Sequence, residues 1–532
     1  MSGFSLVHSR ALMGLRALSV QVEVHLANGL PSFTLVGLAD TEVKEARERV
    51  RSAIANAGLE FPSNKRITVN LAPADIPKDS GRFDLPIALG ILAASGQIDA
   101  SKLVGHEFAG ELSLSGQLRP VQGALAMALG MALQHDHSTG LPPILVLPQG
   151  SAEEASLVPD ARVVRVAHLL DVVARFAPVK IKDDAVQSNS DEPALDTGWT
   201  ILKAPDRRAS VSLADMRDVK GQQAAKRALE IAAAGGHSVL MVGAPGTGKS
   251  MLAQRFASIL PAMSQQEALE SAAVLSLAGQ FKPEHWSQRV VQSPHHTASA
   301  VALVGGGSPP RPGEISLAHE GVLFLDELPH FPRASLEALR EPLESGQISI
   351  SRAAQRAVFP ARFQLIAAMN PCLCGHLGSR TKACKCTPDQ VDRYQGKLSG
   401  PLLDRIDIHV EVQAIDPEDL LQSSAQAAST IAPESSATIA ERVQLARERS
   451  LKRQGMLNRA LEGKALEELI VLDEAARKFL NTAAARLGWS GRSIHRALKV
   501  ARTIADLAGA QSTQVTHVAE AIQYRRVLRA QG

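Results

Sequence analysis

The chain has 532 residues, of which 45% are hydrophobic and 21% are charged. At about 150 residues per domain, this length predicts three or four folding units, and the composition excludes collagen-like, wholly disordered and disulfide-scaffold proteins. The uncharged apolar stretches are shorter than the ~20 residues of a membrane-spanning helix, and Arg10 and Arg16 interrupt any secretory signal. We therefore expect a cytoplasmic protein whose four cysteines do not form structural disulfides.

Charge is distributed unevenly along the chain. The net charge is only +3, from 57 basic and 54 acidic side chains. Residues 441–532 contain 17 basic and nine acidic side chains, so this segment carries +8 and the rest of the chain −5. A basic segment indicates either an anionic partner such as nucleic acid or a solvated helical face. Because aromatic residues make up only 3%, we do not expect a base-stacking surface.

Residues 1–178 alternate apolar strands with helical segments, which predicts a mixed α/β domain. The following residues are acidic, contain Ser, Asn, Asp and Pro, and show no periodicity, so we expect a linker over residues 179–211. The expected strands are residues 19–26, 32–37, 67–71 and 144–147, and the expected helices are residues 41–57 and 85–95.

The next expected domain, residues 212–413, has a glycine-rich loop between an apolar strand (238–242) and a helix (251–260). Strand, glycine loop and helix are the context of a P-loop, whose backbone N–H groups and helix N-terminus bind phosphates. We therefore expect ATP and Mg²⁺ here, with Lys249 reaching the β- and γ-phosphates and Ser250 ligating the metal. The loop consists of Gly243, Ala244, Pro245, Gly246, Thr247, Gly248, Lys249 and Ser250.

Two further apolar strands of this domain end in polar residues. Residues 321–325 lead into Asp326 and Glu327, and residues 363–369 lead into Asn370. Parallel strands place their carboxyl ends at one edge of a sheet, beside the P-loop. There Asp326 would hold Mg²⁺, Glu327 would orient and polarise the attacking water, and Asn370 would hold that water against the γ-phosphate. A strand capped by a polar turn is the alternative for the first segment.

All four cysteines lie within a window of fifteen residues. They form two C-x-C pairs, Cys372 with Cys374 and Cys384 with Cys386. Two thiolate pairs across a short loop suit a tetrahedral Zn²⁺ site, although C-x-C is tighter than the commoner C-x₂-C spacing. Buried free thiols and a redox pair are the alternatives. We expect His376, inside the loop, to lie outside the set of metal ligands.

The remaining segments have weaker signatures. Residues 414–440 include a stretch rich in Ala and Ser, which predicts a second linker, and residues 441–532 are expected to form a basic helical domain. Adjacent histidines, His295 and His296, are expected to be structural residues and not ligands. No internal repeat is present.

Three further motifs resemble one protein family. They are Pro77-Lys78-Asp79-Ser80, Gly400-Pro401-Leu402-Leu403-Asp404-Arg405-Ile406-Asp407 and Val500-Ala501-Arg502-Thr503-Ile504-Ala505-Asp506-Leu507. With the P-loop they resemble the magnesium-chelatase-like AAA+ ATPases of the YifB/ComM family over nearly the whole chain. The resemblance implies an AAA+ motor, an N-terminal α/β domain similar to the Lon-protease (ribosomal S5 domain 2-like) fold, and a helical C-terminal domain. It also implies a ring, expected to be a hexamer, that acts as a DNA helicase in branch migration during natural transformation.

The resemblance assigns roles to two arginines. Arg405 resembles the arginine finger offered to the ATP of the neighbouring subunit, and a cation there can raise the rate by ~10³ to 10⁵. A surface ion pair of Arg405 with Asp404 or Asp407 is the alternative. Arg492 resembles the sensor-2 arginine, and Arg496, one helical turn further, is the other candidate for that role.

Insertions in the motor are the expected DNA contacts, because such insertions line the central pore in this family. Residues 302–314 contain Gly and Pro and are expected to form a flexible loop between strands. Residues 348–361 alternate like a hairpin that carries Arg352 and Arg356. Basic side chains there would bind phosphates of single-stranded, duplex or branched DNA without sequence preference, while a solvated hairpin is the alternative.

Peptidase activity is not expected, although the first domain resembles the Lon-protease fold. Ser80-Gly81-Arg82-Phe83 departs from the nucleophile signature, and Leu125 occupies the position of the dyad lysine. A serine without a base is inert at neutral pH. The main alternative to a DNA motor is a chelatase-type ATPase that inserts a metal or remodels a protein client without nucleic acid. Stimulation of ATP turnover by DNA would discriminate between them.

Overall fold

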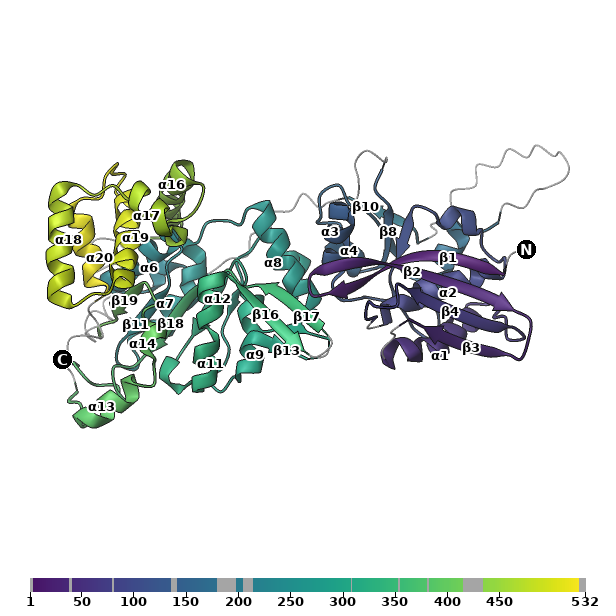
Figure 1. The fold of residues 1–532 in the computed structure, drawn as a ribbon, viewed down its shortest axis with the longest axis horizontal. Helices are drawn as coiled ribbons and strands as arrows, with labels where there is room; N and C mark the ends of the chain where they lie inside the picture. The colour runs from purple at the N-terminus through teal and green to yellow at the C-terminus, as the bar shows by residue number, and fades with distance from the viewer. Residues whose placement is uncertain are drawn as a thin grey trace.

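Two β-sheets and a following group of helices organise the chain (Figure 1). This mixed α/β architecture confirms the expected fold class. The computed structural model describes residues 3–37, 41–78, 81–134, 141–178, 198–203, 214–307, 309–352, 355–379, 382–414 and 434–525. Among these described residues, no helix is long and apolar enough to cross a membrane.

The first sheet has eight strands in the order β10-β9-β8-β5-β1-β2-β4-β3. Valines alternate with polar residues along β2, so Val20, Val22 and Val24 are buried on one face. Helices α1 (Thr41–Asn56) and α2 (Asp84–Ala94) contact each other, and α2 also contacts β1 and β2. The strands are β1 (Phe4–Met13), β2 (Arg16–Ala27), β3 (Ser32–Val36), β4 (Arg66–Ala72), β5 (His106–Phe108), β8 (Ile144–Pro148), β9 (Arg162–Val166) and β10 (Thr200–Leu202).

Strand β10 lies inside the segment that we expected to be a linker. It pairs antiparallel with β9 and closes one edge of the sheet. Its three residues show no hydrophobic periodicity, and Ile201 is 70% exposed, so this segment is placed by backbone pairing with β9 and by the packing of Leu202 against a buried core. The domain also contains α3 (Ala124–Gln134), α4 (Ser151–Ala155), α5 (Leu169–Arg175) and the short strands β6 (Glu111–Leu112) and β7 (Leu118–Arg119).

The second sheet has five strands in the order β12-β15-β18-β11-β19, all parallel. Strands β11 (Val239–Val242), β15 (Val322–Leu325) and β18 (Gln364–Met369) are buried along their whole length, which explains their nearly continuous apolar sequences. The edge strands are β12 (Val291–Gln292) and β19 (Ile408–Glu411). Helices of this motor domain are α6 (Gln223–Gly235), α7 (Lys249–Phe256), α8 (Gln265–Leu277), α11 (Arg333–Ala338), α12 (Arg340–Ser345), α13 (Pro388–Gln395) and α14 (Gly400–Leu403).

Two insertions project from this domain. The expected hairpin is present as β16 (Gln347–Arg352) paired with β17 (Gln355–Pro360). The segment 302–314, expected to be a loop between strands, instead begins within helix α9 (Ala300–Val304) and ends at the first residue of helix α10 (Glu314–Leu317). Strands β13 (Gly305–Gly306) and β14 (Arg311–Pro312) pair within it. Glycine allows this tight pairing, because a Cβ on Gly305 would lie 2.3 Å from the Arg311 carbonyl oxygen.

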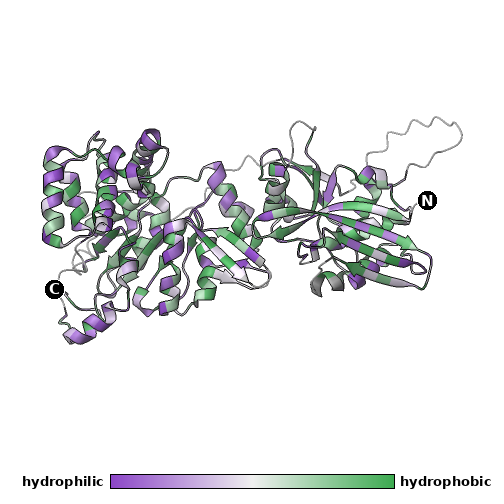
Figure 2. Ribbon diagram, viewed as in Figure 1, coloured by the Kyte–Doolittle hydropathy of each residue, from purple (hydrophilic) through white to green (hydrophobic). Residues whose placement is uncertain are grey.

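Helices α16 to α20 form the C-terminal unit, at the far end of the molecule from the first sheet (Figure 1). Buried residues Ile439, Val443 and Ala446 of α16 join the same apolar core as α6 of the motor. Figure 2 shows hydrophobic residues along the strands of both sheets, whereas α13 is largely hydrophilic. The C-terminal helices are α16 (Ser436–Gln454), α17 (Gly463–Leu469), α18 (Glu474–Leu487), α19 (Gly491–Leu507) and α20 (Val515–Gln523).

The first domain packs directly against the motor. Helix α3 contacts α8, and their side chains share one hydrophobic core that includes Leu125 and Val274. The Gly123 amide donates to the Ser276 carbonyl over 3.1 Å, and Ser276 Oγ donates to Glu154 over 2.6 Å. The two domains therefore meet through both apolar packing and hydrogen bonds.

Candidate nucleotide-binding site

The glycine-rich loop connects the carboxyl end of β11 to the first turn of α7. Gly246 and Gly248 have φ angles of 78° and 90°, a region in which side-chain-bearing residues are strained. A Cβ on Gly243 would lie 2.3 Å from the Val412 carbonyl oxygen. The glycines are therefore required by the path of the loop, and α7 begins where the loop ends.

Lys249 lies at the centre of this edge of the sheet. Its Nζ donates to the carbonyl oxygens of Gly243 and Ala244, at 2.8 and 2.9 Å, and to Asn370 Oδ1 at 3.2 Å. Burial lowers the pKa of Lys249, while the charges of Asp326 and Glu327 oppose that shift. The structure thus brings the loop lysine and the amide after β18 into direct contact.

Asp326 and Glu327 follow β15 at the same edge. Ser250 Oγ donates to Asp326 Oδ2 over 2.6 Å, and the Glu327 amide donates to Asp326 Oδ1 over 2.9 Å. Glu327 has a φ of 53°, which is uncommon for a residue with a side chain and occurs often at functional sites. The hydroxyl and carboxylate expected to ligate Mg²⁺ are therefore neighbours, and the second carboxylate is held in a strained turn.

Two histidines contact the Glu327 carboxylate. His296 Nδ1 and His330 Nδ1 lie 3.2 and 3.3 Å from Glu327 Oε2. The His295 ring packs on His296, with centroids 4.2 Å apart. We expected His295 and His296 to be purely structural, and His330 was not singled out. His330 lies three residues after Glu327 on the same turn, so that spacing could have indicated its contact, whereas His296 lies on a separate segment that meets Glu327 only in the folded chain.

The residues at this edge fit a nucleoside triphosphate with a divalent cation. The donor set combines a buried ammonium, the start of a helix and a positive-φ glycine loop, which suits phosphate oxygens. The Ser250 hydroxyl and the Asp326 carboxylate are oxygen ligands of the kind that Mg²⁺ prefers. ATP and Mg²⁺ would therefore be held by the loop and by the ends of β15 and β18.

Comparison with known proteins finds related families along nearly the whole chain. Residues 215–420 match the family described as magnesium chelatase, subunit ChlI; residues 22–144 match subunit ChlI of Mg-chelatase; residues 433–525 match the C-terminal part of that subunit. The chain is 47% identical to the YifB protein of Salmonella typhimurium over 98% of this chain and 97% of the relative. It is 48% identical to competence protein ComM of Haemophilus influenzae, over 99% and 98%.

The chain belongs to the YifB/ComM family of magnesium-chelatase-like proteins. Its five-stranded parallel sheet and P-loop are those of the AAA+ domain expected for that family. The YifB protein of Escherichia coli is a further relative, 46% identical over 98% of this chain and 97% of the relative.

Both arginines assigned by the family resemblance lie away from the P-loop of their own chain. Arg405 precedes β19, which runs parallel to β11, so it lies at the end of the sheet opposite Lys249. Arg492 lines a hollow of about 920 Å³ between the motor and the C-terminal helices, together with Gly321 and Phe363, which precede β15 and β18. The sheet therefore separates both arginines from their own nucleotide-binding edge.

Arg405 is buried, at 9% exposure. It forms an ion pair with Glu344 and donates to the Pro401 carbonyl oxygen over 2.7 Å. The expected alternative partners are occupied elsewhere, because Asp407 pairs with Arg496 over 2.6 Å and Asp404 with Arg525 over 3.7 Å.

Asp407 anchors this end of the sheet to α19. Burial alone would raise the pKa of Asp407, but His237 and Arg496 beside it hold that pKa well below its usual range. Arg496 also donates to the Arg405 carbonyl oxygen over 3.0 Å. Arg496 is thus committed to a structural ion pair, whereas no ion pair in the described part of the chain involves Arg492, which is exposed. The sensor-2 role of Arg492 stays a prediction.

The four cysteines come together after β18. Their sulfur atoms all lie within 4.8 Å of one another, and Cys372 Sγ is 3.4 Å from Cys374 Sγ and 3.6 Å from Cys384 Sγ. A disulfide would need about 2.05 Å, whereas a tetrahedral site with Zn–S bonds of 2.3 Å places sulfurs about 3.8 Å apart. The cluster fits Zn²⁺ in geometry and donor type, and His376 is not a member of it.

The cysteine loop contacts the nucleotide-binding edge. A Cβ on Gly375 would lie 2.5 Å from Pro245 Cδ, so glycine is needed for this close approach to the P-loop. Gln395 Nε2 donates to the Pro371 carbonyl oxygen over 2.9 Å. Tyr394, whose hydroxyl is hydrogen-bonded to the Asn370 backbone, packs against His330. The cysteine loop thus contacts the P-loop, and the following helix α13 contacts Asn370 and His330.

Leu125, expected at the position of the dyad lysine, has no titratable group and is fully buried in the core shared with the motor. Lys78 is also fully buried and donates to the Pro73 carbonyl oxygen, and burial lowers its pKa. Ser80 lies outside the described residues.

Proposed function

We propose that this protein is an Mg²⁺-dependent ATPase motor that assembles as a hexameric ring and translocates on DNA. Its task would be branch migration of recombination intermediates in natural transformation, in the cytoplasm. The observation that carries the ATPase assignment is the convergence of Lys249, Ser250, Asp326, Glu327 and Asn370 at one sheet edge. Phosphoryl transfer needs mainly positioning and charge neutralisation, which this set can supply.

Each residue at that edge has a distinct task in the proposal. Lys249 and the loop amides bind phosphate oxygens, while Ser250 and Asp326 hold the cation that neutralises charge on them. Glu327 Oε2 lies 3.2 Å from His296 Nδ1 and 3.3 Å from His330 Nδ1, and these contacts would hold its carboxylate where it can orient water. Asn370 contacts Lys249, and its amide would help to position that same water near the bound phosphates.

The position of Arg405 supports the proposed ring assembly. Because this arginine lies at the opposite end of the sheet from its own P-loop, only the nucleotide of a neighbouring subunit is available to it. Arg492 lies at that same end of the sheet and, unlike the buried Arg405, is exposed. Two cations from one subunit would then complete the ATP site of the next.

DNA is the proposed track for three reasons. The relative from Haemophilus influenzae is named a competence protein. The segment 441–532 carries +8, and the hairpin places Arg356 on its exposed surface, where it donates to Ser349 over 3.2 Å. The side chain of Arg352 lies outside the described residues. Basic groups of this kind bind phosphates without sequence preference.

The decisive experiment is the ATPase rate of the full chain with single-stranded, duplex and branched DNA. A DNA motor should turn over ATP faster with DNA, and most with the branched form. An ATPase rate that no DNA changes would favour a chelatase-type remodelling ATPase, the alternative suggested by the magnesium-chelatase family matches. Strand displacement on a branched substrate then separates translocation from mere binding.

We also propose that the four-cysteine cluster holds one structural Zn²⁺. Support comes from the sulfur spacing and from the position of the loop against Pro245. Structural zinc contributes ~10 to 16 kcal/mol to ordering small sites. Its task here would be to hold the loop that supports Asn370, with no part in the chemical step.

A further inference from the structure

A cavity of about 280 Å³ lies between the first domain and the motor. One side of its wall comes from the first domain: the turn between β1 and β2, the segment that precedes α2 and the segment that precedes α3. The end of α8, the β13–β14 insertion and β17 of the hairpin form the other side. The cavity is therefore built by both domains, and it is continuous with the two insertions expected to contact DNA.

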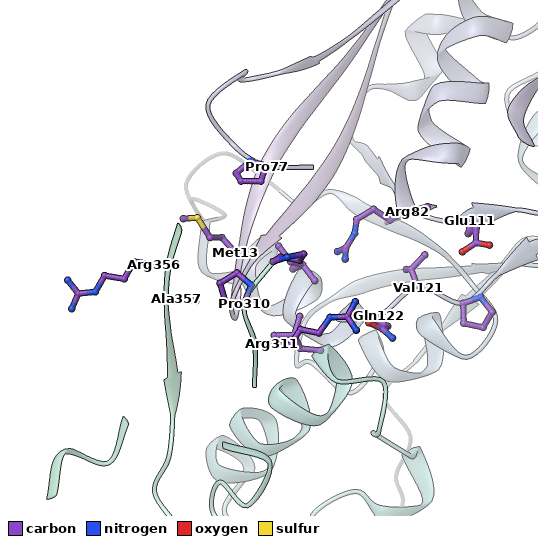
Figure 3. Close-up of a pocket in the computed structure, with 16 residues that line it drawn as sticks. Met13, Pro77, Arg82, Glu111, Val121, Gln122, Pro310, Arg311, Arg356 and Ala357 are labelled. Carbon is purple, nitrogen blue, oxygen red and sulfur yellow. The ribbon is translucent and has the colours of Figure 1, made fainter. Parts of the chain in front are cut away.

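The wall of this cavity is rich in positive charge. Arg82, Arg311 and Arg356 line it, and Glu111 is the one acidic residue among the described lining residues. Glu111 lies 3.4 Å from Arg119, which balances part of its charge. Figure 3 shows the Arg82 and Arg311 side chains directed into the gap from opposite domains, whereas Arg356 points away from it.

Arg82 belongs to a motif that the ATPase does not use. It follows Pro77-Lys78-Asp79-Ser80, and it is buried at 3% exposure. A Cβ on the preceding residue, Gly81, would lie 2.7 Å from Glu111 Cγ, so glycine is needed to bring this turn against the cavity wall. Arg82 is therefore held at the junction of the two domains.

The chemistry of the cavity favours a phosphate group. Guanidinium forks match the oxygens of phosphate and can bind them in a bidentate manner, and Gln122 adds a neutral amide beside them. None of the described lining residues is aromatic, so the site provides no surface for stacking bases. Its volume lies just below the ~300 to 1,000 Å³ of pockets for whole small molecules, which suits a phosphodiester with its flanking sugars.

We infer that this cavity binds the phosphodiester backbone of single-stranded DNA, with Arg82 and Arg311 contacting phosphate from opposite domains. The first domain would then form part of the DNA path, directly above the motor insertions. This inference rests on the proposed function, because it names where the DNA track of that motor runs.

The test measures binding of a fluorescein-labelled single-stranded thymidine 30-mer to the full chain by anisotropy at 50 to 200 mM salt. Each phosphate contact to a single strand contributes a slope of about 0.7 in log K against log salt. Arg311→Gln should therefore reduce the slope by about 0.7, so that the loss of affinity over this fourfold salt range becomes about 2.6-fold smaller. Arg82→Gln combined with Arg311→Gln should roughly double that change in slope.

Arg333→Gln is the matched control, because Arg333 is an exposed motor arginine on α11 outside the cavity wall. It should keep the wild-type slope. If wild-type protein binds no DNA, the proposed function fails. If wild type binds and Arg311→Gln keeps its slope, the proposed function stands and the cavity assignment is overturned.

A second measurement uses wild-type protein, so its result does not depend on whether the Arg82 variant folds. An oligonucleotide containing 4-thiothymidine, cross-linked to wild-type protein by light, should label peptides around both Arg82 and Arg311. Labelling of motor peptides alone would contradict a shared site. Calorimetry with inorganic phosphate tests whether the cavity instead binds a free phosphorylated compound. Lys249→Ala protein is used so that the P-loop does not contribute to phosphate binding. Saturable phosphate binding that Arg311→Gln abolishes, with DNA binding unchanged, would assign the cavity to a free phosphorylated compound and overturn the DNA path.

Discussion

His296 Nδ1 lies 3.2 Å from Glu327 Oε2, and this contact joins the segment before α9 to the carboxylate after β15. His330 approaches the same oxygen at 3.3 Å. Glu327 is only half-buried, so without these rings its side chain would be free to leave the geometry needed for hydrolysis. The pair therefore acts on the proposed reaction by positioning Glu327.

We expect His296→Ala to lower kcat about tenfold, roughly 1.4 kcal/mol, with little change in the KM for ATP. Steady-state phosphate release measures both quantities. His285→Ala serves as the control, because the exposed His285 contacts Gln288 and not Glu327. Equal kcat values for His296→Ala and wild type would remove the positioning role.

Lys249→Ala and Glu327→Gln should separate binding from hydrolysis. Removing the ammonium that contacts the loop and Asn370 should abolish turnover and weaken nucleotide binding. Glu327→Gln keeps the shape of the side chain but loses its charge, so this variant should bind ATP and fail to cleave it. Fluorescent nucleotide binding and phosphate release measure the two steps. Turnover by Glu327→Gln at the wild-type rate would disprove the assigned role.

Arg405→Ala should bind nucleotide but hydrolyse it at least a hundredfold more slowly, because the lost cation acts on transition-state charge. Mixing this variant with Lys249→Ala subunits should restore part of the rate. In a mixed ring, the intact P-loop of an Arg405→Ala subunit can face the intact Arg405 of a Lys249→Ala subunit. A titration of one variant into the other, followed by ATPase assay, shows this as a maximum. A flat titration would argue against action between subunits.

Metal analysis of reduced protein should find one zinc per chain. Cys384→Ser should lower zinc content and also the ATPase rate, because a disordered loop no longer supports Asn370 through Tyr394. Nucleotide binding should persist, since Lys249 and its loop are unchanged. His376→Ala is the control and should retain zinc. Zinc-free protein with full ATPase activity would leave the cluster as unligated thiols.

We expect the stability of the folded chain to depend on pH through Glu154, which lies at the interface between the first domain and the motor. Burial raises the pKa of its carboxyl from 4.5 to about 7, although the Ser276 hydrogen bond opposes this. Between these pH values the Glu154 carboxyl is protonated in the folded state and ionised in the unfolded state. The contribution of Glu154 to the free energy of unfolding therefore falls as the pH rises from 5 to 7 and is constant above pH 7. The loss is at most about 3 kcal/mol. Glu154→Gln should flatten the Tm between pH 5 and 8, whereas Glu153→Gln should not.

Local patterns in the sequence determined the nucleotide-binding edge. The strand 238–242, the glycine loop and the carboxylates after 321–325 are short-range signals, because a buried parallel strand must be apolar and its carboxyl end must meet its neighbours at one edge. Ser250 and Asp326 accordingly lie 2.6 Å apart. Cysteine spacing likewise predicted the cluster that the structure forms. These features depend on residues that are close in sequence or on strand polarity alone.

Tertiary packing decided the remaining features. His296 meets Glu327 only because two separate segments converge, and β10 is placed by pairing with β9 and by the packing of Leu202 against a buried core. The opposite placement of Arg405 and Lys249 follows from the parallel direction of β11 and β19. The cavity between Arg82 and Arg311 exists because α3 packs on α8. Such long-range contacts depend on which faces of helices and sheets pack against each other. The hydrophobic periodicity of a single segment does not indicate its packing partner.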